Sequence, residues 1–265
     1  MNAPIGVIDS GVGGLTVAKQ IMRALPNETI YYIGDTARCP YGPRKSGEVL
    51  TFTMQLAKAL EQKDVKLLVI ACNTATAVAL DALRKELSIP VVGVINAGAR
   101  AAIKKTKRNE IVVLATEGTI RSGAYERALL SLNTKAKIIP LACPTFVPLV
   151  ESGEYEGQFA FELVANGLMP LKNKSFDTVI LGCTHYPMIQ HHIEKVVGPD
   201  VTVLSSAEET AKEVKELLVN LDLLRTEKSE PHHIFYVTGS VPIFRTIAEN
   251  WLERKELDIR KIKLN

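Results

Sequence analysis

Two segments of this 265-residue chain share one pattern, in which an apolar strand is followed by a small residue, a cysteine and polar residues. The first segment contains Cys72, and the second contains Cys183, 111 positions later. Another pair of similar segments, Gly6–Gly11 and Val112–Gly118, is separated by about 106 positions. Two features repeated at nearly the same offset indicate that the chain consists of two similar halves.

Short apolar runs rich in β-branched residues alternate with amphipathic helical patterns. The predicted strands are Ile5–Asp9, Thr29–Gly34, Leu67–Ala71, Val91–Val94, Ile111–Ala115, Lys137–Leu141 and Thr178–Leu181. The predicted helices are Leu15–Leu25, Val49–Gln62, Ala75–Leu87, Ala97–Lys105 and Tyr125–Leu132. This alternation predicts an α/β fold whose parallel sheets are covered by helices on both faces.

The repeat predicts two α/β domains, the first made of residues 1–96 with 207–265 and the second of residues 97–206. The C-terminal part extends beyond a simple duplication, with a helical pattern at Ala207–Leu224 and a strand-like run at His233–Thr238. We expect it to return to the first domain. Open α/β sheets bind ligands beyond the carboxyl ends of their strands, where both repeated cysteines fall. The site should therefore lie in the cleft between the domains.

Composition and charge exclude several classes of function. The net charge is only +3, with 32 basic and 29 acidic residues interspersed, so a nucleic-acid partner is not expected. No apolar run reaches the roughly 20 residues of a membrane helix, and no signal peptide is visible. We therefore expect a cytoplasmic protein, away from the membrane, whose four cysteines stay reduced. No Cys/His spacing typical of zinc sites occurs, so no metal is expected.

Two opposed thiols suit two kinds of chemistry. Disulfide redox usually uses cysteines that are close in sequence and in direct contact. Two-base proton transfer instead needs one group on each face of a stereocentre, in opposite protonation states, and no cofactor. The second kind fits Cys72 and Cys183 better. Cys39 and Cys143 lack the repeated context and are interpreted as structural.

The turn after the first strand offers two interpretations. Gly11, Gly13 and Thr16 nearly match a dinucleotide-binding loop, but Thr16 replaces the third glycine and Asp9 would place a negative charge beside the phosphates. We favour a tight turn whose N–H groups hold a substrate carboxylate, with Asp9 handling a proton or binding an ammonium group.

Among the remaining ionisable residues, His185 follows Cys183 by two positions and could activate its thiol. Glu151 is expected in a loop, with either a functional or a merely local role. The other histidines, His191, His192, His232 and His233, are expected at the surface.

The chain resembles the aspartate/glutamate racemase superfamily, and the glutamate racemases in particular, over nearly its whole length. Five segments carry the resemblance: Ile8–Thr16, Asp35–Gly42, Ala71–Ala75, Pro148–Glu151 and Leu181–Pro187. The resemblance implies that Cys72 and Cys183 are the catalytic pair, with Asp9, Glu151 and His185 as supporting ionisable residues. It also implies that the substrate site is lined by Ser10, Tyr41, Gly42, Asn73, Thr74, Thr116, Thr119 and Thr184.

The same resemblance implies two domains related by pseudo-two-fold symmetry, no pyridoxal phosphate, a homodimer, and D-glutamate made for peptidoglycan. Two alternatives stay open at this point. One is racemisation of another acidic amino acid, such as aspartate. The other is a two-domain binding protein for small molecules whose cysteines have no chemical role.

Overall fold

The structure, a computed structural model, describes residues 2–227 and 229–264. Six strands form the first sheet, in the order β10-β9-β2-β1-β3-β4. Their bounds are β1 (Ile5–Asp9), β2 (Ile30–Gly34), β3 (Leu67–Ile70), β4 (Val91–Gly93), β9 (Ile234–Val237) and β10 (Asp258–Lys261). All five neighbouring pairs are parallel.

Four strands form the second sheet, in the order β6-β5-β7-β8. Their bounds are β5 (Glu110–Ala115), β6 (Lys137–Ala142), β7 (Thr178–Gly182) and β8 (Thr202–Ser205), and all pairs are again parallel. The order β2-β1-β3-β4 in the first sheet matches β6-β5-β7-β8 in the second. The prediction of an α/β fold with two similar parallel sheets is therefore confirmed, and β3 and β7 are the equivalent strands of the repeat.

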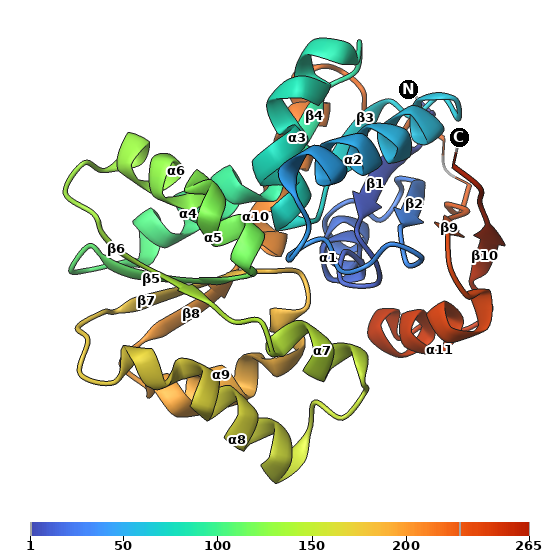
Figure 1. The fold of residues 1–265 in the computed structure, drawn as a ribbon. Coiled ribbons are helices and arrows are strands. Elements are labelled where there is room, and N and C mark those ends of the chain that lie inside the picture. Colours follow the sequence, from blue (N-terminus) through green and yellow to red (C-terminus); the bar gives the residue numbers. More distant parts are fainter. Residues whose placement is uncertain (1, 228, 265) are drawn as a thin grey trace.

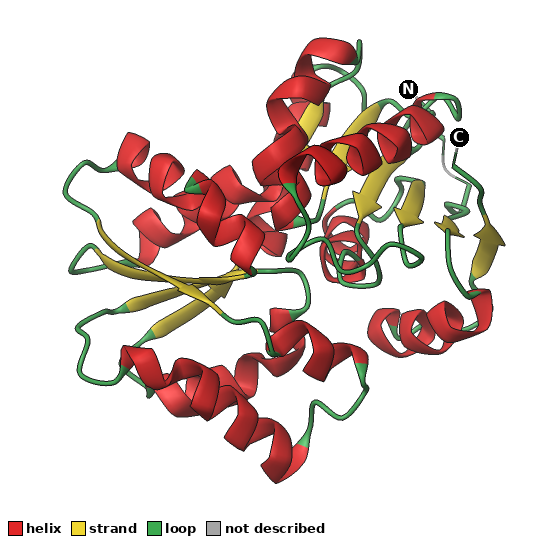
Figure 2. Ribbon diagram, in the orientation of Figure 1, coloured by secondary structure: helices red, strands yellow, loops and turns green. Residues whose placement is uncertain are grey.

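Helices cover both faces of each sheet (Figure 2). The α-helices are α1 (Leu15–Ala24), α2 (Ser46–Glu61), α3 (Asn73–Glu86), α4 (Val94–Lys105), α5 (Glu117–Ser122), α6 (Ala124–Leu132), α7 (Phe146–Glu151), α8 (Gly157–Leu168), α9 (Gln190–Val197), α10 (Ser206–Asn220) and α11 (Val241–Leu252). Two 3₁₀ turns, η1 (Met169–Leu171) and η2 (Tyr186–Ile189), complete the set. Figure 1 shows α4, α5 and α6 on one face of the second sheet and α8 and α9 on the other.

Two edge strands, β8 and β10, lack the apolar pattern that marks the predicted strands. All residues of β1 and β3 are buried, as expected for strands covered on both faces. By contrast, the edge strands β8 and β10 contain no fully buried residue, and β10 has the polar sequence DIRK. Neither has a clear apolar pattern, and neither was predicted.

The two halves share a core. One cluster of buried apolar side chains extends from Val7 in β1 and Leu15 in α1 to Leu181 in β7 and Ile193 in α9. Helix α10 packs against both α1 and α4, so it also joins the two halves. Among the described residues, no helix is long and apolar enough to cross a membrane.

Candidate active site

The carboxyl ends of four strands carry the reactive side chains. Asp9 is the last residue of β1, and Cys72 lies two residues beyond the end of the neighbouring β3. In the second sheet, Thr116 follows β5, and Cys183 follows the neighbouring β7. Because the strand order reverses between each of these pairs, both sheets present the topological switch point at which α/β proteins bind ligands.

Side chains from both halves surround about 300 Å³ of empty space, including space open to solvent, at these strand ends. The lining consists of Ser10, Pro40, Tyr41, Gly42, Cys72, Asn73, Thr74, Thr116, Val147, Gly182, Cys183, Thr184 and His185. Three further predicted residues lie behind the lining and hydrogen-bond to it: Asp9 through Thr184, Thr119 through Thr74, and Glu151 through His185. The structure thus brings all the predicted site residues into one region.

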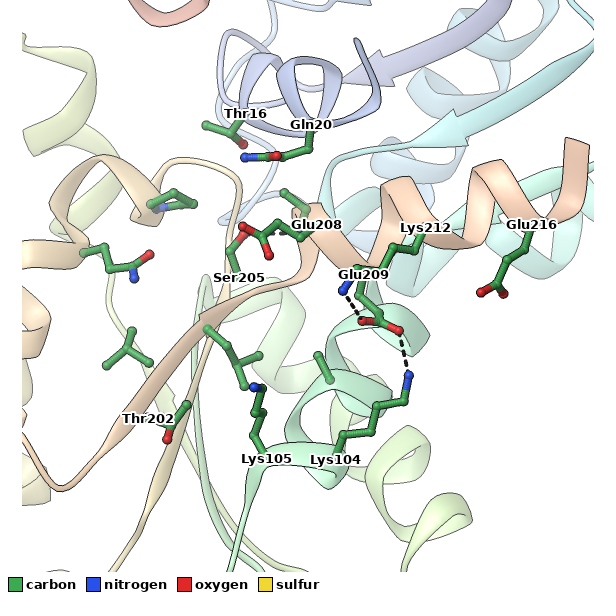
Figure 3. A pocket seen from close by; sticks show the side chains of 16 residues that line it. Thr16, Gln20, Lys104, Lys105, Thr202, Ser205, Glu208, Glu209, Lys212 and Glu216 are labelled. Atoms are coloured by element: carbon green, nitrogen blue, oxygen red, sulfur yellow. Dashed lines mark hydrogen bonds and ion pairs between the residues drawn. The ribbon is translucent and has the colours of Figure 1, made fainter. Parts of the chain in front are cut away.

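A larger hollow, with about 1310 Å³ of empty space including space open to solvent, lies between α1, α4, α10 and β8 (Figure 3). Three of its charged side chains pair with one another, since Lys104 and Lys212 both contact Glu209. The described residues that line it include no cysteine and no histidine. The smaller cavity at the two cysteines is therefore the candidate active site.

Cys72 is held in an environment that favours the neutral thiol. It is the N-cap of α3, and its sulfur accepts a hydrogen bond from the Ala75 N–H at 3.4 Å. Burial, followed by the nearby charge of Asp9, raises its pKa to about 12. Hydrogen bonds from Ala75 and from the Ser10 side chain oppose this rise by stabilising the thiolate. Cys72 is thus a proton donor whose thiolate form, once made, is stabilised by these two hydrogen bonds.

Cys183 belongs to a chain of three ionisable groups. Its sulfur lies 3.8 Å from Nδ1 of His185, and Nε2 of His185 lies 3.1 Å from Oε1 of Glu151. Burial disfavours the charged imidazole, but the hydrogen bonds to Cys183 and Glu151 outweigh it and raise the pKa of His185 to about 10. At neutral pH the imidazolium of His185 therefore donates a hydrogen bond to both the sulfur of Cys183 and the carboxylate of Glu151.

Glu151 was expected in a loop but is the last residue of α7. Burial raises the pKa of its carboxyl group, but the hydrogen bond and charge of His185 outweigh burial, so the net pKa is lowered. The carboxylate is therefore ionised and can hold the imidazolium of His185 in place.

Asp9 connects the two halves of the molecule through hydrogen bonds that go to Gly11 and Thr184 and not to Cys72. Its Oδ1 accepts from the Gly11 N–H at 2.9 Å, and its Oδ2 accepts from the Thr184 hydroxyl at 3.4 Å. Burial raises its pKa, while the charge of His185 opposes the rise. Asp9 influences Cys72 through its charge, because it raises the pKa of that thiol.

The cavity also contains polar groups suited to an anionic ligand. The Oδ1 atom of Asn73 accepts a hydrogen bond from the Tyr125 hydroxyl at 2.7 Å, whereas the buried Nδ2 has no partner in the structure. Asn73 is the first residue of α3, where helix N–H groups have no intrahelical partners. A free amide donor beside a helix N-terminus is well placed to bind a carboxylate.

Three hydroxyls from the two halves form a compact group at the same cavity. Thr74 lies 2.8 Å from Thr116 and 3.1 Å from Thr119, and the last two are 3.1 Å apart. Gly42 packs directly on this group, because a Cβ atom there would come within 2.7 Å of Thr116 Cβ. Tyr41 donates a hydrogen bond to the buried Asp35 and thereby fixes the loop that carries Gly42.

The glycine turn after β1 packs against the second half. A Cβ atom on Gly13 would lie 2.2 Å from Oγ1 of Thr184 and 2.6 Å from Nδ1 of His185, so glycine is required by this close approach. The space that a dinucleotide pyrophosphate would need above Gly13 is therefore filled by Thr184 and His185. This packing argues against the dinucleotide interpretation of the turn.

The prediction of a surface position was wrong for His192, and one contact of a cysteine was not predicted. The thiol of Cys39, which was interpreted as structural, donates a 3.1 Å hydrogen bond to Oε1 of Glu151 at the edge of the site. The only feature of the sequence that could have placed Cys39 near the site was its position within the Asp35–Gly42 segment, one of the five that carry the family resemblance. His192 is 6% exposed rather than at the surface, and the half-buried His233 accepts a hydrogen bond from the Ile30 N–H. Cys143, by contrast, is a buried member of the core.

One cluster among the described residues could hold a metal ion, and it lies outside the cavity. It consists of Glu156, His191 and His192.

Comparison with known proteins gives full-length matches. A sequence profile of the Asp/Glu/hydantoin racemase family matches residues 5–214. The chain is 72% identical over 264 residues to a glutamate racemase of Lysinibacillus sphaericus, covering 100% of both chains. A glutamate racemase isoform from Bacillus anthracis has a solved structure with a TM-score of 0.96 and 49% identity, covering 99% of this chain and 98% of that one. A glutamate racemase from Francisella tularensis, solved in complex with D-glutamate, gives a TM-score of 0.93 at 37% identity, covering 100% and 98%.

Proposed function

The chain belongs to the Asp/Glu/hydantoin racemase family and is an isomerase of the glutamate racemase type, and we propose that it interconverts L- and D-glutamate by proton transfer between Cys72 and Cys183. The observation that carries this mechanism is the equivalence of the two cysteines. Each follows the same strand of a repeated sheet, and both line one cavity. Their surroundings differ in the way that two-base chemistry requires.

In the forward step, the thiolate of Cys183 takes the α-proton of glutamate and becomes a thiol, which leaves an electron pair on Cα. The thiol of Cys72 then gives its proton to the opposite face of Cα and becomes a thiolate. One C–H bond breaks and one forms, with no net oxidation, so neither a metal nor pyridoxal phosphate is needed. The reverse reaction exchanges the two roles. The assignment of Cys183 to L-glutamate and Cys72 to D-glutamate rests on family resemblance.

The supporting residues prepare these two states. His185 donates to Cys183 and is itself held by Glu151, so the imidazolium stabilises the thiolate that starts the forward reaction. Asp9 favours the protonated form of Cys72 that completes it. After turnover Cys183 is a thiol and Cys72 is a thiolate. We propose that His185 and Asp9 transfer the protons that restore the starting protonation states.

Substrate binding is assigned to the polar lining of the cavity. The free Nδ2 donor of Asn73 and the N-terminus of α3 would hold one carboxylate of glutamate, with the hydroxyls of Thr74 and Thr116 beside it. Ser10, Tyr41, Gly42, Thr119 and Thr184 complete or support this lining. The complex of the Francisella relative with D-glutamate supports this choice of substrate.

Several further properties follow from the family and stay part of the proposal. D-Glutamate is used in peptidoglycan synthesis, so the enzyme would act in the cytoplasm, where the precursors are made. We also propose that it forms a homodimer. The division into residues 1–96 with 207–265 and residues 97–206 would allow the site to open between the two domains.

Exchange of the α-proton with deuterated solvent tests the function. The purified protein should catalyse exchange and racemisation of glutamate, and much less of aspartate. Faster reaction of aspartate would assign the chain to the other substrate. A protein that binds glutamate without exchanging its α-proton would be a binding module, and the catalytic proposal would then be wrong.

A further inference from the structure

We propose that Glu156, His191 and His192 form a binding site for a divalent transition-metal ion of the zinc type, separate from the catalytic cavity. One potential ligand atom from each residue lies within 4.8 Å of those from the other two. Two imidazoles and one carboxylate suit ions such as Zn²⁺ and Co²⁺, with water completing the coordination. This inference does not depend on the racemase reaction.

His192 gives the site a fixed element. The residue is 6% exposed, and its Nε2 atom lies 3.2 Å from the carbonyl oxygen of Tyr155. Because a carbonyl can only accept, Nε2 carries the hydrogen, and Nδ1 keeps the lone pair that a metal requires. Metal-binding histidines are commonly oriented in this way, by a hydrogen bond from their other ring nitrogen. The ring of Phe161, 6.1 Å away between centroids, packs against the same imidazole.

His191 and Glu156 supply the accessible part of the site. Nε2 of His191 lies 3.2 Å from Oε2 of Glu156, and these side chains are 49% and 72% exposed. That separation is close to the distance between two ligand atoms on a tetrahedral zinc ion with bonds of about 2.0–2.1 Å. The nearby ammonium group of Lys195 lies 4.5 Å from the Phe161 ring centroid, so it is directed at a ring rather than at the carboxylate.

The location of the cluster gives the ion a structural consequence. Glu156 follows Glu151 by five residues, and His191 follows His185 by six. The chain segments that are joined by the Glu151–His185 contact are therefore joined again at the cluster. A bound ion would tie the loop before α8 to the start of α9 and would stabilise the region that holds this pair.

Titration of the untagged protein with Co²⁺ tests the site, because the spectrum of bound cobalt reports its ligands. We expect one tight site with visible bands of nitrogen and oxygen ligation and without the strong ultraviolet band of thiolate ligation. His191→Ala and Glu156→Gln should each weaken binding by about tenfold or more, since even loss of a second-shell partner commonly costs 10–100-fold. His192 is left unchanged, because its burial would confuse loss of a ligand with loss of stability.

His232→Ala is the matched control. His232 also pairs with a carboxylate, that of Asp258, at 2.8 Å, but among the described residues this pair is not part of a three-residue cluster that could hold a metal. Its loss should therefore leave the affinity for cobalt unchanged. Co²⁺ should raise the melting temperature of the wild type and of the control, and not of the two cluster variants. Equal affinity in wild type and both cluster variants, or a thiolate band, would overturn the proposal.

Discussion

The thiol of Cys39 donates a hydrogen bond to the carboxylate of Glu151 across the two halves of the molecule, with 3.1 Å between sulfur and Oε1. The same oxygen lies 3.1 Å from Nε2 of His185. Burial, together with the charge of Glu151, raises the pKa of Cys39, so this residue stays a neutral donor. Cys39 thus connects the loop after β2 with the group that orients His185.

Replacement of Cys39 tests this contact. Cys39→Ala should lower kcat by up to about tenfold, equivalent to ~1.4 kcal/mol, because Glu151 loses one of its two partners. Cys39→Ser retains a donor and should keep most of the activity. Steady-state kinetics of both variants measure the effect. Full activity in the alanine variant would show that the contact does not position Glu151.

Asn73 should act mainly in substrate binding. Asn73→Ala removes the free Nδ2 donor and should raise KM by about tenfold or more, since a hydrogen bond to a charged group contributes ~1.5–3 kcal/mol. Tyr125→Phe removes only the hydroxyl that orients this amide, so a smaller increase is expected. If KM is unchanged in Asn73→Ala while kcat falls, the assignment of Asn73 to ground-state carboxylate binding is wrong.

The raised pKa of His185 predicts a specific dependence of stability on pH. Its value of about 10 in the folded protein lies above the usual value of about 6.5. The stabilisation from this group is therefore complete below about pH 6.5 and is lost as the pH rises through about 10. His185→Asn cannot take up the proton. The difference in unfolding free energy between wild type and variant, from urea titrations, should shrink between pH 6.5 and 10. A difference that grows with pH would contradict the charge assignment.

Asp9 and His185 should affect the two reaction directions differently. Asp9→Asn should act more on the direction in which Cys72 is the base, and His185→Asn more on the direction in which Cys183 is the base. The ratio of the two kcat/KM values is fixed by the equilibrium, so the asymmetry must be sought in kcat, KM or isotope effects. Equal losses of kcat in both directions, with unchanged isotope effects, would make both residues general electrostatic groups rather than dedicated partners.

The sequence predicted the features that are repeated or that follow strand ends. Cys72 and Cys183 could be identified because each ends a strand with the same pattern, and the parallel sheets place both at the carboxyl edge. The joining of Glu151 to His185 was not predictable from spacing, because the two residues are 34 positions apart and meet only through the packing of α7 near η2.

The features that the sequence did not predict also have physical reasons. Cys39 and Glu151 are 112 positions apart and belong to different halves, so no local pattern marks their contact. His192 was expected at the surface because no functional motif surrounds it in the sequence, but it packs against Phe161 and hydrogen-bonds to the Tyr155 carbonyl. The edge strand β10 was not predicted because its sequence DIRK is mostly charged, as is common for edge strands, where charged side chains oppose pairing with another strand.

The central claim is that inversion needs both Cys72 and Cys183, one on each face of the substrate. The most direct measurement is the rate of racemisation, followed by circular dichroism from L-glutamate and from D-glutamate, in Cys72→Ala and Cys183→Ala. Cys143→Ala, which changes a buried core thiol, serves as the control and should remain active. Each of the first two variants should be folded and should lose racemisation in both directions. Racemisation at a near-normal rate in either of them would contradict the two-base mechanism.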